Sequence, residues 1–117
     1  VSTVPLKEMC ESQCPPSAVI AIGPPIMMNF CALTTQPYNV PTTVSLNTIM
    51  IDGTGMCGGC RVSIGGETKF VCVDGPEFDA HLVDWDNMMM RMKSFKPREQ
   101  EDFHKCKLQA QADALSK

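Results

Sequence analysis

Three cysteines lie close together in a glycine-rich part of this chain, at spacings that suit a metal site. Residues 50–62 read MIDGTGMCGGCRV, and residues 70–78 read FVCVDGPEF. Cys57, Cys60 and Cys72 therefore follow the pattern C-x2-C-x11-C. Thiolates at such spacings are ligands of zinc and of iron–sulfur clusters. The segment therefore indicates metal binding, and redox chemistry if the metal is iron.

The spacing of plant-type [2Fe–2S] motifs predicts the fourth ligand. Those motifs read C-x4-C-x2-C and are completed by a distant cysteine. Asp52 stands at the position of the first cysteine, so the pattern here is D-x4-C-x2-C-x11-C. A carboxylate is anionic like a thiolate, although it is a harder ligand. We therefore predict one [2Fe–2S] cluster with the ligands Asp52, Cys57, Cys60 and Cys72. Three cysteines stay open as alternative fourth ligands: Cys10, Cys14 and Cys106.

The residues around these ligands have the properties that a cluster loop needs. Glycine permits positive φ and a close approach of the backbone, and it frees amides to donate hydrogen bonds to sulfur. We expect five residues to line the cluster and to tune it: Gly53, Gly55, Gly58, Gly59 and Arg61.

Other functions of the same cysteines remain open. A structural zinc accepts three cysteines and an aspartate, and a Cys57–Cys60 pair has the spacing of a redox dithiol. Two polar residues that follow Cys72 are not expected to be ligands. We interpret His81 as a loop residue bonded to backbone, and Asp74 as a turn former with Gly75.

Composition limits the classes of function. The chain has 117 residues, a net charge of −3 and no basic block, so neither nucleic-acid nor membrane binding is expected. Seven cysteines cannot form a complete set of disulfides. Metal-binding thiols favour a reducing compartment, hence the cytoplasm.

The first part of the chain, residues 1–49, predicts a small parallel α/β unit. Residues 5–14 have the pattern of a short helix, and Val19–Ile22 that of a buried strand. A helix is expected from Pro25 onward, with its apolar positions at Ile26, Met27, Phe30, Cys31 and Leu33, and with Cys31 in the core. A strand at 42–46 follows and completes a βαβ unit.

The remaining residues predict a cluster module, 50–83, and a helical segment, 84–117. Residues 61–73 read as a hairpin with a Gly65-Gly66 turn, so Cys72 is expected on its second strand. Residues 74–84 are expected to be irregular. Asp84 or Asp86 is expected to cap a helix that Pro97 interrupts. A polar helix follows, on which His104 and Cys106 are expected at the surface.

The segments GPPIMM, MIDGTGMCGGCRV and VCVDGPEFDAHLVD together resemble a known family. It is the flavin- and [2Fe–2S]-carrying small subunit of NADH-dependent reduced ferredoxin:NADP oxidoreductase, also known as the sulfide dehydrogenase small subunit. That family is related to the electron-transfer subunit of dihydroorotate dehydrogenase. The resemblance covers about residues 5–106 and implies one aspartate and three cysteines as cluster ligands, which correspond to Asp52, Cys57, Cys60 and Cys72.

The resemblance also implies FAD and NAD(P) in the family, with Gly23, Pro24 and Pro25 near the flavin and nicotinamide. The family's flavin-binding barrel and phosphate loop have no counterpart in these residues, so we expect neither cofactor on this chain alone. The expected fold is a truncated βαβ piece of a ferredoxin-reductase-like nucleotide domain, followed by the cluster module and C-terminal helices.

Three functional hypotheses follow. The first is an electron-transfer protein with one [2Fe–2S] cluster, which is not an enzyme alone and relays single electrons between redox partners such as a ferredoxin or a flavoprotein subunit. The second is a subunit or fragment of an FAD/NAD(P)H-dependent ferredoxin oxidoreductase. The third is a zinc-stabilised interaction module. Open sheet edges favour an oligomer or a subunit of a complex, with the helices of residues 88–108 as contacts.

Overall fold

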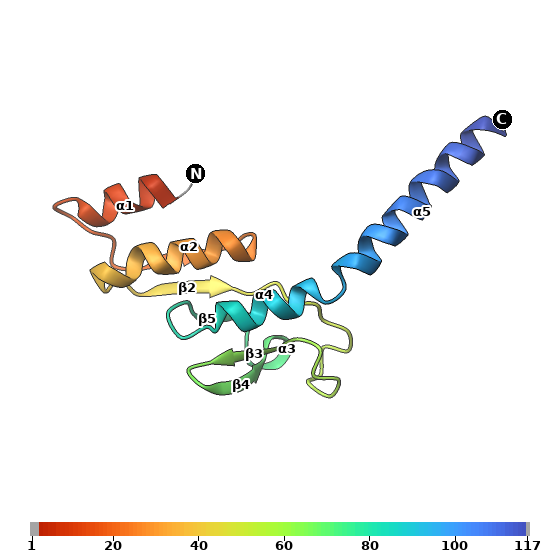
Figure 1. Cartoon of the computed structure of the whole chain (residues 1–117). Helices are drawn as coiled ribbons and strands as arrows, with labels where there is room; N and C mark the ends of the chain where they lie inside the picture. Colours follow the sequence, from red (N-terminus) through yellow and green to blue (C-terminus); the bar gives the residue numbers. More distant parts are fainter. Residues whose placement is uncertain (1–2, 117) are drawn as a thin grey trace.

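The computed structural model describes residues 3–116 and contains a three-stranded mixed sheet, a separate β-hairpin and five α-helices (Figure 1). The larger sheet has the strand order β1-β2-β5, and the hairpin consists of β3 and β4. The expected combination of helices and strands is confirmed, but the sheet is mixed and not parallel throughout, because β5 pairs antiparallel with β2. Within the described residues, no helix is both long and apolar enough to span a bilayer.

The expected βαβ unit is present. Strand β1 (Val19–Ala21) pairs in parallel with β2 (Thr42–Ser45), and α2 (Pro25–Thr35) connects them, followed by the 3-10 turn η1 (Gln36–Tyr38). Helix α2 begins at Pro25. Backbone N–H groups in the first turn of a helix have no acceptor within the helix, so the missing N–H of proline costs nothing there. The description of β1 as buried is wrong, because β1 is an edge strand that buries only Ala21 and leaves Ile20 70% exposed.

Helix α2 buries a different face from the one expected. Its buried residues are Met28, Cys31, Ala32 and Thr35, so the prediction of Cys31 in the core is confirmed, and burial raises the pKa of its thiol. Ile26, Phe30 and Leu33 are more than half exposed. The helix is apolar on both sides, and periodicity alone does not say which side meets the sheet.

The N-terminal helix is shorter than expected. Helix α1 (Thr3–Glu11) packs on α2 and buries Leu6 and Cys10. It ends where the Ser12 hydroxyl donates to the Met9 carbonyl oxygen, at 2.7 Å, and this contact satisfies a carbonyl at the helix end. Cys14 therefore lies beyond the helix and is exposed.

A strand forms where irregular structure was expected. Strand β5 (Glu77–Asp79) pairs antiparallel with β2, with Phe78 opposite Val44. Its three residues carry no strand pattern of their own, and pairing with the free edge of β2 supplies the missing stabilisation. The predicted segments 1–49 and 50–83 thus share one sheet. The division into segments 1–49, 50–83 and 84–117 stays a prediction.

The hairpin is confirmed, but its second strand is shorter than expected. Strands β3 (Arg61–Ile64) and β4 (Glu67–Phe70) pair antiparallel, and Gly65 and Gly66 both have positive φ, as a type I′ turn requires. Cys72 does not lie on a strand, because residues 71–74 form a single helical turn, α3 (Val71–Asp74). The Asp74 carboxylate accepts a hydrogen bond from the Phe70 amide at 2.8 Å and so closes this turn.

Two further helices, α4 and α5, follow β5. Asp84 caps α4 (Trp85–Lys93) by accepting a hydrogen bond from the Asn87 amide, and Trp85 and Met88 of this helix are buried in the core. Helix α5 (Lys96–Leu115) carries Pro97 in its first turn and has no buried residue, so His104 and Cys106 are on the surface as expected. Figure 1 shows α5 projecting away from the rest of the molecule.

Replacing Asp84 with alanine should destabilise the fold. The substitution removes the side-chain acceptor at the start of α4, and loss of such a cap costs about 1 kcal/mol. Urea unfolding should show this loss for Asp84→Ala and a near wild-type value for Asp84→Asn, which retains an acceptor oxygen. Equal destabilisation by the two variants would contradict the capping role.

Candidate metal centre

The loop between Asp52 and Cys57 is closed by the Asp52 carboxylate. One carboxylate oxygen accepts a hydrogen bond from the Thr54 amide at 3.0 Å, and the other accepts one from the Cys57 amide at 2.8 Å. The Thr54 amide, followed by that of Cys57, holds the pKa of Asp52 below its ordinary value, against the opposing effect of desolvation. Asp52 therefore fixes the backbone that leads to the first predicted cysteine ligand.

Glycine is required within this loop. Gly55 has a φ of +84°, and a Cβ atom there would lie 2.9 Å from the Val73 side chain. Side chains are rarely tolerated at such a φ, and this contact would be closer than packing allows. The loop consequently approaches α3, the turn that carries Cys72.

Cys60 and Cys72 form a close pair. Their sulfur atoms lie 3.4 Å apart, and the Cys72 amide donates to the Cys60 sulfur at 3.5 Å. Burial opposes ionisation of Cys60, but the amide and the thiol of Cys72 outweigh it and lower the pKa of Cys60. The contact with Cys60, together with burial, raises the pKa of the Cys72 thiol. The pair can therefore hold a single negative charge between two sulfur atoms.

Cys57 lies on the exposed side of the same loop. Its sulfur accepts a hydrogen bond from the Gly59 amide at 3.4 Å, and a Cβ atom at Gly59 would lie 3.6 Å from that sulfur. Gly59 therefore donates to a predicted ligand, as expected for a glycine-rich cluster loop.

The four predicted ligands are arranged as two pairs. Cys60 and Cys72 are in contact through their sulfur atoms, whereas Asp52 reaches the backbone of Cys57. Among residues 3–116, no three histidine, cysteine or acidic side chains converge closely enough to hold a single metal ion. The structure thus brings one pair of ligands together and keeps the other pair in the adjacent loop.

The alternative ligands lie elsewhere. Cys10 is buried between α1 and the core, and Cys106 is on the projecting helix α5 (Figure 1). His81 does not bond backbone through its ring as expected, because its Nε2 atom lies 3.0 Å from the buried Thr35 hydroxyl. Asp74 closes a turn, but through the Phe70 amide and not with Gly75 as predicted.

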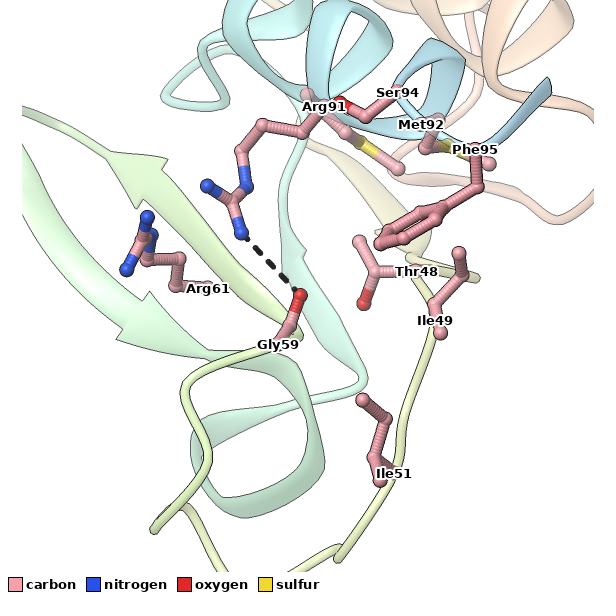
Figure 2. A pocket seen from close by; sticks show the side chains of 10 residues that line it. Thr48, Ile49, Ile51, Gly59, Arg61, Arg91, Met92, Ser94 and Phe95 are labelled. Carbon is pink, nitrogen blue, oxygen red and sulfur yellow. Dashed lines mark hydrogen bonds between the residues drawn. The ribbon is translucent and has the colours of Figure 1, made fainter. Parts of the chain in front are cut away.

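A cleft of about 260 Å³ adjoins the cluster loop, between residues 48–51, the start of β3 and the end of α4. Figure 2 shows Arg91 extending from α4 toward the Gly59 carbonyl, with Ile49, Ile51 and Phe95 on the other side. Arg91 donates to this carbonyl at 3.4 Å. Arg61 is exposed at the rim of the cleft. The sequence analysis did not identify Arg91 as a site residue. The sequence indicates its position only through helical spacing, because Arg91 lies three residues after the buried Met88.

Comparisons with known proteins agree with this picture. Residues 47–84 match the model of the iron–sulfur cluster binding domain of dihydroorotate dehydrogenase B. An uncharacterised protein of Clostridium beijerinckii is 61% identical over 80 residues, which are 68% of this chain and 27% of that protein. A Thermotoga maritima homologue of the electron transfer subunit of dihydroorotate dehydrogenase B is 54% identical over 79 residues, which are 68% of this chain and 28% of that protein.

A solved structure has a similar fold over most of the chain. It belongs to a study of flavin-based electron bifurcation by NADH-dependent reduced ferredoxin-NADP oxidoreductase, and it superposes with a TM-score of 0.76 at 42% identity. The superposition covers 90% of this chain and 38% of the solved one. The chain thus spans between a quarter and two fifths of these relatives, 27% to 38% of their lengths. The resemblance inferred from the sequence is confirmed, and residues 47–84 carry a domain similar to the iron–sulfur cluster binding domain of dihydroorotate dehydrogenase B.

Proposed function

We propose that this chain is an electron-transfer protein or subunit that holds one [2Fe–2S] cluster through Asp52, Cys57, Cys60 and Cys72. The observation that carries the proposal is the contact between Cys60 and Cys72, 3.4 Å apart beside a glycine-rich loop, within the segment that matches an iron–sulfur cluster binding domain. The same segment contains Asp52 and Cys57.

The donor set fits a two-iron cluster better than a single ion. Each iron of a [2Fe–2S] cluster takes two protein ligands. The sulfur atoms of Cys60 and Cys72 are in contact, and the Asp52 carboxylate is bound to the backbone amide of Cys57 in the adjacent loop. A structural zinc site also accepts three cysteines and an aspartate, but the family model that matches residues 47–84 is that of an iron–sulfur cluster binding domain. The zinc-stabilised module is therefore the weaker alternative.

Asp52 can serve both as a turn former and as a ligand. A carboxylate has about four lone-pair positions, and the amides of Thr54 and Cys57 occupy two of them. The remaining positions suffice for one bond to iron. The hydrogen bonds also orient the carboxylate, which reduces the entropy lost when it binds the cluster.

The role of the polypeptide is to hold the cluster and to stabilise its charge. When bound, the cluster supplies one-electron redox chemistry. The Gly59 amide donates to the Cys57 sulfur, and the Cys72 amide donates to the Cys60 sulfur. Such hydrogen bonds stabilise negative charge on sulfur and contribute to the reduction potential.

A second candidate is a subunit or fragment of an FAD/NAD(P)H-dependent ferredoxin oxidoreductase. The similarity to a solved oxidoreductase over 90% of this chain favours it, as do the β1-α2-β2 unit and the Gly23, Pro24 and Pro25 segment. Under either candidate, the partner is a ferredoxin or a flavoprotein subunit in a reducing compartment such as the cytoplasm.

Exposed apolar side chains on α2 are consistent with a chain that binds a partner protein. Ile26, Phe30 and Leu33 share the outer side of α2 and are 61%, 52% and 55% exposed. A contiguous exposed apolar patch can mark an interaction site. We expect size-exclusion chromatography with light scattering to show a species larger than a monomer, and a clean monomer would count against it.

Chemical analysis of anaerobically purified protein tests the main proposal. We expect about two irons and two sulfides per chain, no zinc, and an EPR signal of spin one half after reduction with dithionite. Stoichiometric flavin would favour the oxidoreductase subunit. Zinc without iron would refute both redox functions.

Ligand substitutions test the assignment of residues. Cys57→Ala should lose most of the iron because it removes one of the four ligands. Asp52→Cys should keep a [2Fe–2S] cluster with an altered spectrum, since it restores the all-cysteine spacing. Cys14→Ala is the matched control, because Cys14 is exposed and outside the loop. Full iron and an unchanged spectrum in Cys57→Ala would show that the assignment is wrong.

A further inference from the structure

One charged side chain outside the predicted ligand set reaches the cluster loop. Arg91 belongs to α4, more than thirty residues after Gly59 in the sequence, and its guanidinium lies 3.4 Å from the Gly59 carbonyl oxygen. Figure 2 shows this side chain crossing one end of the cleft. Gly59 is the residue before Cys60, and its own amide donates to the Cys57 sulfur. Arg91 therefore contacts the peptide between two predicted ligands.

The positive charge matters more here than the hydrogen bond. A donor–acceptor distance of 3.4 Å is long for an N–H···O bond, so the bond itself is weak. Charge–charge energy falls only with the inverse of distance, so a guanidinium beside Gly59 still acts on the neighbouring sulfur atoms. Arginine also keeps its charge at every accessible pH.

The surroundings preserve this effect. Arg91 is partly buried, and the cleft beside it is lined by the apolar side chains of Ile49, Met92 and Phe95. Within residues 3–116, no carboxylate lies within ion-pair distance of Arg91. The charge is thus neither neutralised by an acidic neighbour nor fully screened by water.

We propose that Arg91 places a fixed positive charge beside the Gly59–Cys60 peptide and thereby raises the reduction potential of the cluster. Reduction adds one negative charge to the cluster, and a nearby fixed positive charge stabilises the reduced form more than the oxidised form. The inference rests on the proposed [2Fe–2S] function and assigns a role to α4, which contributes none of the predicted ligands.

Redox titration of the full chain, followed by visible absorbance and EPR, tests this role. Arg91→Met removes the charge and keeps most of the apolar stem, so its midpoint potential should be lower than that of the wild type. Arg91→Lys retains the charge and should stay close to the wild type. Lys93→Met is the matched control, because Lys93 is an exposed cation on the same helix, and its midpoint should not change.

Iron content and far-UV circular dichroism accompany each titration. Should Arg91→Met fail to fold, Arg91→Gln serves as the charge-removing variant with the same expected direction. The proposal would be overturned if the charge-removing variant kept full iron content and the midpoint potential of the wild type. It would also be overturned if Lys93→Met lowered the midpoint potential as much as the Arg91 variant does. The proposed function fails separately, if the wild-type protein itself holds no iron and sulfide.

Discussion

The contact between the Cys60 and Cys72 sulfur atoms is the constraint on which the rest of the structure depends. The hairpin register pairs Arg61 with Phe70. Continuing it would place Val71 opposite Cys60 and point Cys72 to the other face, because side chains alternate along a strand. The single turn α3 prevents this, since it rotates Cys72 toward Cys60 until the sulfur atoms are 3.4 Å apart. Asp74 closes that turn through the Phe70 amide, so its role is structural.

Bringing sulfur atoms together creates an electrostatic problem that the surrounding backbone solves. Two thiolates in contact repel each other, and the low dielectric of a protein strengthens that repulsion. Within the pair, the Cys72 amide donates to the Cys60 sulfur. The Gly59 amide donates to the separate Cys57 sulfur, and the Arg91 guanidinium lies at the edge of the loop. Gly55 allows the loop to approach α3 closely enough for this arrangement. The Cys57 and Cys60 sulfur atoms therefore each accept a backbone hydrogen bond, and Arg91 adds the positive charge whose effect on the cluster we propose.

Features that depend on local chemistry could be predicted from the sequence, and features that depend on distant contacts could not. The Gly65-Gly66 turn, the Asp84 cap and the proline start of α2 each follow from a few neighbouring residues. Strand β5 exists because the distant strand β2 offers it a free edge. The turn α3 is an exception, because the contact of Asp74 with Phe70 that closes it is local and was still not predicted. The buried face of α2 and the contact of Arg91 with Gly59 also depend on packing partners that no local pattern names. The candidate ligands were inferred from spacing, because metal sites constrain spacing strongly, and their assignment stays a prediction.

The four predicted ligands differ in exposure: Cys60 is buried and Cys72 is half-buried, whereas Asp52 and Cys57 are exposed. Cys60 is 2% exposed, whereas the neighbouring loop carries Ile51 and Met56 at 77% and 89% exposure. A fully buried site would hold its charge at a high desolvation cost and would lie far from any redox partner. A fully exposed site would leave the sulfur atoms open to water and oxidants. With Cys60 anchored in the core, Cys72 half-buried beside it, and the other predicted pair in a glycine-rich loop tied by Asp52, the proposed site would meet both demands within one short segment.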